Sequence, residues 1–315
     1  MDRLITFPAT DAGALGSRQR TVKAAIDCIG IGVHSGRTIR LVIRPADANH
    51  GIVFHRTDLN RLIPARYDTV CDTRMCTVVA DPAMPSARVG TIEHVMAALY
   101  GVGIDNALIE VDGPEVPILD GSAGPYLFLL DCAGSVEQDA PRTVIEVRAP
   151  VRVAAGDAWA EFRPLTPLGR NAQPVLDMEL SIDFAASAIG QQSCALQLTP
   201  DSFRSQIAEA RTFALAPDIE QLQAAGLAQG GSLDNAIVVD GDLVLNPGGL
   251  RMENEFANHK MLDAVGDLAL AGARLHGRFV AHRTGHTLNN RLLRALFASE
   301  TARREPVADA LSVAA

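Results

Sequence analysis

The order of strands and helices constrains the fold of this chain most, because the same order occurs twice. In the first half, apolar runs at 38–45, 51–58, 76–80 and 107–113 predict strands, and helices are predicted at 91–101 and 123–134. From residue 143 the chain returns to strands and again finishes in helices. Strands and helices grouped in this way favour two α+β domains of similar design over a doubly wound parallel sheet.

The expected domain limits follow from this repeat and from the length of 315 residues, which suggests about two domains. We expect a flexible arm at 1–18, an N-terminal α+β domain at 19–136 and a C-terminal α+β domain at 143–300. The polar segment GSVEQDAPR, 134–142, is the expected linker, and 301–315 is expected to be a flexible tail. A smaller unit near 213–245 combines a short strand, a helix at 217–226 and a hairpin around Asp240–Asp242.

Charge and cysteine usage limit the class of protein. A net charge of −9 and few aromatic residues argue against a nucleic-acid surface. The five cysteines are scattered and include no C-x-x-C pair, which fits a reducing compartment. No apolar run is long enough for a signal peptide or a membrane span. We therefore expect a cytoplasmic protein, and nothing in the sequence demands more than a monomer.

The stretch NEFANHKMLDAVGDLALAG, 254–272, places His259, Asp263 and Asp267 at i, i+4 and i+8, so that one helical stripe carries an imidazole and two carboxylates. Apolar residues occupy the other side of this helix. A solvated face with a weak ion pair is the ordinary interpretation of such a stripe. A site facing another element is the alternative.

The helix expected at 91–101, TIEHVMAALYG, favours the alternative. Its apolar residues recur at i, i+3, i+4 and i+7, with Thr91 expected to cap the helix and Gly101 to end it. Glu93 and His94 lie off the apolar stripe, and their neighbours on that side are alanines without Lys or Arg. A polar face with such small neighbours is expected to pack closely against another element.

These residues could build a catalytic zinc site, which takes three protein ligands and leaves a position for water. His94, His259 and Asp263 are an allowed ligand set, and Glu93 could serve as the general base. Spacing alone does not decide this, because H-x-x-x-D is common and no H-E-x-x-H motif occurs. His286, in the glycine turn RTGHTLNN, could either be structural or project into a cleft.

Several motifs together resemble one family. They are GIGVHSGRTIRLVIRPA, HRTDL, TIEHVMAALYGVGIDNALIEVDGPEVPILDGSA, ARTFALAPDIEQLQAAGLAQGGSLDNAIVVD, NEFANHKMLDAVGDLALAG and RTGHTLNN. In this order, over roughly residues 19–300, the chain resembles the UDP-3-O-acyl-N-acetylglucosamine deacetylases of lipid A biosynthesis.

The resemblance implies a zinc-dependent hydrolase that removes acetate from the 2-amide of UDP-3-O-(3-hydroxyacyl)-N-acetylglucosamine, the step that commits the sugar to lipid A. It also implies that the two α+β domains are two-layer α/β sandwiches packed together, with Zn²⁺ at their interface. The unit at 213–245 would be a β-α-β insert that forms an apolar passage for the acyl chain. Alternatively, this insert would only shield the hydrophobic core from solvent.

The resemblance also implies catalytic roles. His94, His259 and Asp263 match the metal ligands, and Glu93 matches the base that takes a proton from the attacking water. The hydroxyl of Thr212 would stabilise the oxyanion. Protonated His286 would donate to the amine leaving group, and Asp267 would hold His286 in its cationic form. The substrate is an acylated UDP-N-acetylglucosamine, expected to be contacted by Lys260, Phe213, Arg283 and Cys76.

Three features remain open in this sequence. His34, in GVHSG, matches a family position near the site, and a structural role is the alternative. The segments 81–90 and 164–175 are expected to be extra loops near the substrate entrance and in the second domain.

Two other functions also remain: a binding protein for sugar nucleotides or acyl chains with a structural metal, and a non-catalytic assembly subunit without metal.

Overall fold

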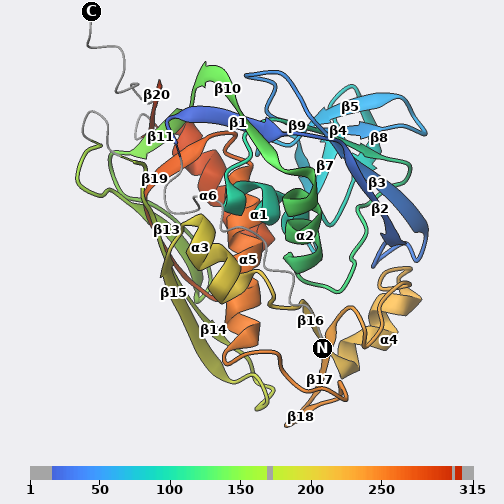
Figure 1. The fold of residues 1–315 in the computed structure, drawn as a ribbon. Coiled ribbons are helices and arrows are strands. Elements are labelled where there is room, and N and C mark those ends of the chain that lie inside the picture. The colour runs from blue at the N-terminus through green and yellow to red at the C-terminus, as the bar shows by residue number, and fades with distance from the viewer. Residues whose placement is uncertain (1–15, 169–172, 300–301, 307–315) are drawn as a thin grey trace, which may run out of the picture.

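The computed structural model describes residues 16–168, 173–299 and 302–306 (Figure 1). Its helices are α1 (Glu93–Val102), α2 (Gly124–Ala133), α3 (Pro200–Ser202), which continues into the π-helical turn η1 (Phe203–Ile207), α4 (Ala216–Ala224), α5 (Glu255–Ala269) and α6 (His286–Ala298). No helix in these ranges is both long and apolar enough to cross a membrane.

The strands before residue 142 form three sheets. The largest has the order β2-β3-β9-β4-β5, and in it only β4 and β9 run parallel. The strands are β1 (Arg18–Val22), β2 (Ile26–Ile31), β3 (Thr38–Arg44), β4 (Ile52–Arg56), β5 (Arg61–Pro64), β6 (Val70–Asp72), β7 (Val78–Asp81), β8 (Met84–Val89), β9 (Ala107–Val111) and β10 (Ser135–Pro141). β6, β7 and β8 form a small sheet, and β1 pairs with β10.

A second large sheet is built after residue 142 in the order β12-β13-β19-β11-β20, with β14 between β19 and β15. Strand β19 runs antiparallel to β13 and parallel to β11 and β14. Its strands are β11 (Thr143–Val147), β12 (Val151–Ala155), β13 (Ala158–Arg163), β14 (Leu176–Asp183), β15 (Gln191–Gln197), β19 (Arg274–His282) and β20 (Ala302–Pro306). The strands β16 (Phe213–Leu215), β17 (Ile237–Asp240) and β18 (Leu243–Val244) form a separate small sheet.

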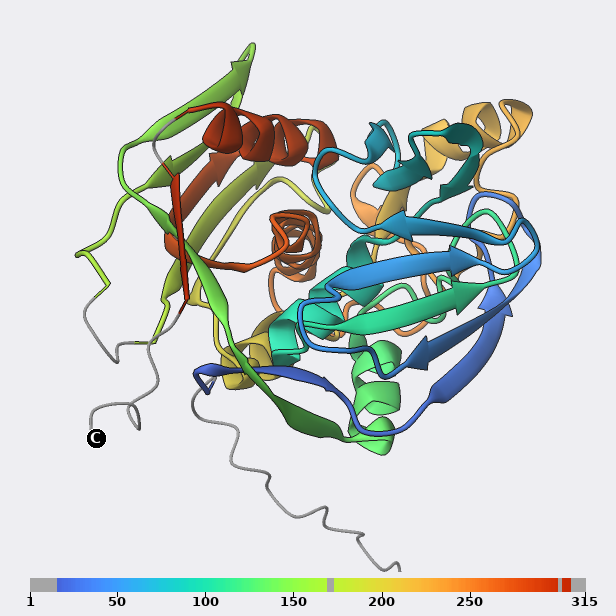
Figure 2. The ribbon, with the colours of Figure 1, turned by 90° about the horizontal axis from the view of Figure 1, so that it is seen from above.

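Helices α1 and α5 lie side by side between the two large sheets, where Figure 2 shows α5 end-on. The apolar side of α5 is fully buried, as its periodicity predicts: Met261, Leu262 and Val265 are 0% exposed. The stripe that carries His259, Asp263 and Asp267 is also buried. The solvated-face interpretation of this stripe is therefore wrong, because α1 covers it.

The architecture is a mixed α/β fold with several sheets, as the α+β prediction requires, and it is not a doubly wound parallel sheet. The alternation of buried and open residues in β14 follows the period of two expected for a strand with one buried face. The three-residue helix α3 continues directly into the π-helical turn η1.

The predicted ends of α1 were wrong. Thr91 does not cap the helix; it has a φ of 56°, and Ile92 is the N-cap without a side-chain hydrogen bond. Gly101 lies inside α1, and the helix ends before Gly103, whose φ of 87° suits a glycine cap. The N-terminus of α1 is instead fixed by its burial among neighbouring elements.

Three of the four segments predicted to be irregular contain strands. The expected linker at 134–142 is mostly strand β10, which pairs with β1. The expected loop at 81–90 contains β8, paired with β7. Part of the expected tail is β20, paired with β11. The described residues of 164–175 form no helix or strand, as expected, and residues 1–15 and 307–315 of the expected arm and tail lie outside the described residues.

Candidate active site

Three predicted metal ligands meet where α1 faces α5. The Nε2 atoms of His94 and His259 lie 3.6 and 3.4 Å from Oδ1 of Asp263, and the possible ligand atoms all lie within 4.8 Å of one another. All three residues are at most 3% exposed. The i, i+4 spacing on α5 supplies two donors, and α1 supplies the third from the other half of the chain.

The donor set fits a zinc ion. Two atoms bonded to one tetrahedral zinc at about 2.0–2.1 Å lie about 3.4 Å apart, close to the separations from Asp263. Nδ1 of His259 lies 3.0 Å from the carbonyl oxygen of Ala210, to which it must donate, so Nε2 keeps its lone pair for a metal. Burial lowers the pKa of His259 to about 4, against the opposing effect of Asp263, so this ligand is neutral at pH 7.

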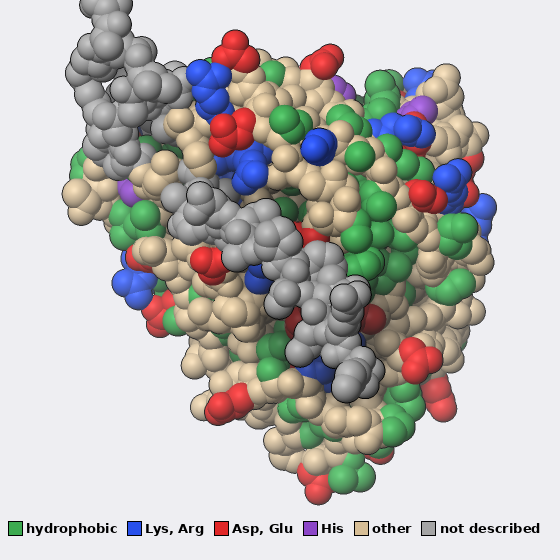
Figure 3. Space-filling view, viewed as in Figure 1, with side chains coloured by type: hydrophobic (Ala, Val, Ile, Leu, Met, Phe, Trp, Pro, Cys, Tyr) green, Lys and Arg blue, Asp and Glu red, His purple; other side chains and the backbone are tan. Residues whose placement is uncertain are grey.

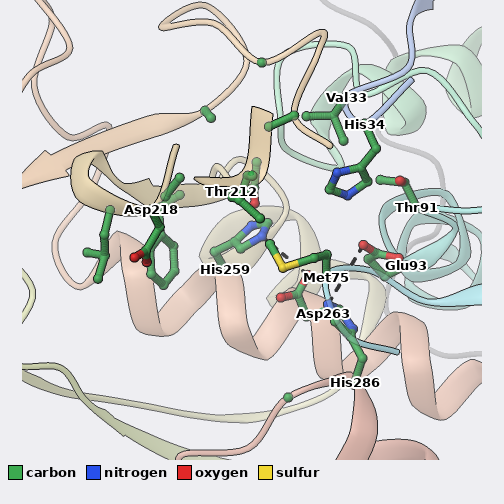
Figure 4. A pocket seen from close by; sticks show the side chains of 18 of the residues that line it. Val33, His34, Met75, Thr91, Glu93, Thr212, Asp218, His259, Asp263 and His286 are labelled. Carbon is green, nitrogen blue, oxygen red and sulfur yellow. Dashed lines mark ion pairs between the residues drawn. The ribbon is translucent and has the colours of Figure 1, made fainter. Parts of the chain in front are cut away.

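Glu93, on α1, and His286, on α6, face each other beside Asp263 (Figure 4). Oε1 of Glu93 lies 4.0 Å from Nε2 of His286, and both side chains are largely buried. Burial raises the pKa of Glu93, although His286 and His94 oppose the shift. A carboxylate with a raised pKa is suited to accept a proton near neutral pH.

His286 is held as a cation. Burial lowers its pKa, but Asp267 and Glu93 outweigh burial and raise the pKa to about 9. Nδ1 of His286 donates to Oδ2 of Asp267 at 2.9 Å, as the sequence predicted. His286 is also the first residue of α6, not part of a free glycine turn. Because a helix N-terminus disfavours a cation, the charge of His286 depends on these carboxylates.

The three predicted metal ligands, Glu93 and His286 line one cavity of about 820 Å³. The polar end holds the metal ligands, Glu93 and His286. The other end is lined by apolar residues of the segment β16-α4-β17, including Leu215, Ile219, Leu222, Leu233, Ala236 and Val238. The cavity thus joins a buried polar centre to an apolar channel.

Comparison with known proteins shows the family. A family model described as LpxC, UDP-3-O-acyl N-acetylglycosamine deacetylase, matches residues 19–298. The chain belongs to this deacetylase family. It is similar to the UDP-3-O-acyl-N-acetylglucosamine deacetylases of Shewanella sp. (strain ANA-3) and Shewanella baltica (strain OS155 / ATCC BAA-1091). Each is 48% identical over 288 residues, which cover 90% of this chain and 91% of the relative.

Four further residues also line the cavity: Thr212, Phe213, Lys260 and Arg283. The resemblance to the deacetylase family assigns each of them a role. The main chain of Thr212 is anchored between Gly121 and Ile237 by hydrogen bonds of 2.8 Å. The ring of Phe213 packs edge-on against Phe256 and lies 6.3 Å from the ring of His259. Lys260 Nζ donates to Oδ2 of Asp263, the oxygen that points away from the imidazoles.

Cys76 is not where the resemblance to the deacetylase family placed it. Its side chain is 7% exposed and does not line the cavity, whereas its neighbour Met75 does. His34 lines the cavity. Its main-chain N–H donates to Glu115, and its buried Nδ1 has no hydrogen-bond partner among the described residues.

Three residues at this deacetylase site were missed by sequence reasoning. Thr77 and Asn289 donate hydrogen bonds to Asp267. Gly266 lets α5 approach α1: a Cβ built there would lie 2.0 Å from the carbonyl oxygen of Glu93. Only Gly266 carried a sequence signal, because a glycine inside a helical pattern usually has a packing reason.

The face of the molecule in Figure 3 shows acidic, basic and apolar side chains intermixed. Over the described part of this face, basic side chains do not merge into one continuous field.

Proposed function

We propose that the chain hydrolyses the 2-acetamido group of UDP-3-O-(3-hydroxyacyl)-N-acetylglucosamine, with zinc held by His94, His259 and Asp263. Membership of the deacetylase family carries the reaction class, a deacetylation in lipid A biosynthesis. One observation of the structure carries the mechanism: three metal-binding donors, a buried carboxylate and a cationic imidazole open into the same cavity.

Bound zinc supplies Lewis acidity, which makes water a better nucleophile and polarises the amide carbonyl. Glu93 accepts the proton of the attacking water, since its carboxylate faces the cavity beside the ligand His94. Attack on the amide carbon places negative charge on the carbonyl oxygen. The hydroxyl of Thr212, which lines the same cavity, donates a hydrogen bond to that oxyanion.

His286 completes the reaction by protonating the amine as the C–N bond breaks. An amide anion is too poor a leaving group to depart without this proton. The pKa of His286, raised to about 9, keeps the imidazole protonated at neutral pH, and Asp267 orients it through Nδ1. Nε2 therefore faces Glu93 and the cavity as the donor atom.

The rest of the cavity accounts for substrate selection. Lys260 and Arg283 provide positive charge for the diphosphate in an otherwise acidic protein. The apolar walls contributed by β16, α4 and β17 suit a fatty acyl chain, and Phe213 stands between them and the metal ligands. This segment, 213–245, is the proposed acyl-chain insert.

We also infer two two-layer α/β domains, at 19–136 and 143–300. The five-stranded sheet uses only residues 26–111 and the seven-stranded sheet only residues 143–306, which supports a division near 142, although β20 extends the second sheet beyond residue 300. The scattered free cysteines support a reducing, cytoplasmic setting. We also expect a monomer, with a mass near 33.4 kDa by light scattering.

The decisive experiment measures acetate and free amine released from the acylated UDP sugar, with and without a chelator. We expect turnover that is lost with the chelator and restored by zinc, and about one zinc per chain. The His94, His259 and Asp263 triple alanine variant should bind none. Tight substrate binding without acetate release would favour a binding protein, and absence of any metal would favour an assembly subunit.

A further inference from the structure

Thr77 contacts Glu93 and also Asp267, the hydrogen-bond partner of His286. Its main-chain N–H donates to Oε2 of Glu93 at 3.0 Å, and its hydroxyl donates to Oδ1 of Asp267 at 2.5 Å. The residue is 1% exposed and precedes β7. One buried residue therefore holds the proposed base directly and the partner of the proposed acid through its side chain.

These contacts decide which oxygens face the reaction. With Oε2 of Glu93 bound to Thr77, Oε1 is the oxygen 4.0 Å from Nε2 of His286. With Oδ1 of Asp267 bound to Thr77, Oδ2 is left to receive Nδ1 of His286. Asn289 Nδ2 donates to the same Oδ2 at 2.8 Å and is itself oriented by the hydroxyl of Thr284.

We propose that Thr77 is a positioning residue that sets the separation of Glu93 and His286 for the deacetylation. Thr77 contacts α1 through Glu93 and α5 through Asp267, and Asp267 in turn holds His286, the first residue of α6. Among the described residues, Thr77 is the one that donates to both Glu93 and Asp267. Asn289 has the lesser task of holding Oδ2 of Asp267.

The hydroxyl of Thr77 can be tested apart from its main chain. Thr77→Val removes the hydroxyl at nearly constant volume and leaves the N–H bond to Glu93, whereas Thr77→Ser keeps both donors. In the valine variant Oδ1 of Asp267 loses its donor, so the carboxylate is held only through Oδ2 and fixes the orientation of His286 less well. The substrate contacts themselves are unchanged.

The proposal rests on the proposed deacetylase function, and the measurement is release of the free amine from the acylated UDP sugar. We expect Thr77→Val to lower kcat by about tenfold or more with KM within about twofold, and Thr77→Ser to recover most of the loss. Zinc content and Tm should stay close to those of the wild-type protein. In an Asp267→Asn background, Thr77→Val should lower kcat much less than it does alone, because both changes disrupt the same series of hydrogen bonds from Thr77 through Asp267 to His286.

Thr21→Val is a matched control, since Thr21 is also a buried threonine. Its hydroxyl oxygen accepts a hydrogen bond from the N–H of Ala46, and both residues are far from the site residues in sequence. Thr21→Val should leave kcat unchanged. Normal kcat in Thr77→Val, or additive losses with Asp267→Asn, would overturn the positioning role while wild-type turnover stands. Failure of the wild-type protein to release amine would instead overturn the proposed function.

Discussion

Gly266→Ala should separate the two helices that build the site. A Cβ at position 266 would lie 2.0 Å from the carbonyl oxygen of Glu93, whereas ordinary contact begins at 3.4 Å. Relief of this clash requires a shift of 3.4 − 2.0 = 1.4 Å between α1 and α5. The atoms in the way are main chain on both sides, so no side-chain rotation can absorb the shift.

The shift acts on catalysis because Glu93 and His94 move with α1, while His259 and Asp263 stay on α5. A misplacement of about 1 Å can cost about a hundredfold in rate. Overpacking costs about 1–3 kcal/mol, and the better helix propensity of alanine returns about 1 kcal/mol. We therefore expect about a hundredfold lower kcat/KM with a stability loss of about 2 kcal/mol or less.

The assay is amine release at saturating zinc, together with zinc affinity and thermal unfolding. Zinc affinity should also fall, since the ligands come from both helices. Gly248→Ala is the control, because a Cβ there meets no atom within 4 Å and should change nothing. A folded, zinc-loaded Gly266→Ala protein with near-wild-type kcat/KM would refute the argument that this close helix contact places the catalytic groups.

Other substitutions test the remaining assignments. Glu93→Gln and His286→Ala should keep about one zinc by metal analysis and lose on the order of a hundredfold in turnover each; near-normal rates would contradict the assigned role. Protonated His286 is the active form, so activity should fall as pH rises through about 9, and Asp267→Asn should move this limb of the pH–rate profile to lower pH. An unmoved limb would exclude the pairing. Arg211→Met removes the ion-pair partner that lies 2.8 Å from the buried carboxylate of Glu255. It should lower the free energy of unfolding in urea by about 3–5 kcal/mol. A decrease below about 1 kcal/mol would show that Glu255 does not depend on this ion pair.

Elements with a strong apolar period were predictable. The 3.6-residue pattern located α5 and the apolar side of α1, and alternation located strands such as β3 and β14. Burial of these apolar faces is the main source of stability for these helices and strands, so their apolar residues can be recognised in the sequence as a periodic pattern.

Elements held by distant partners were not predictable. Strand β10 is polar and mostly open to solvent, and it is a strand because it pairs with β1, more than 100 residues earlier. The same applies to β8 and β20, which lie at sheet edges and carry little apolar pattern. Thr91 was expected to cap α1 because its residue type is a good cap, yet burial of the helix start decided its conformation.

The sequence by itself determined the chemistry available to this protein: which imidazoles and carboxylates exist, and that two ligands share one face of α5 through the geometry of a single helix. Only the tertiary structure decided that α1 lies against that face, that Cys76 does not line the cavity, and that Thr77, Asn289 and Gly266 contact the site. The reason is physical. Helical periodicity is a local property of the chain, whereas the separation of Glu93 from His286 is set by contacts among α1, α5 and α6, which no local pattern encodes.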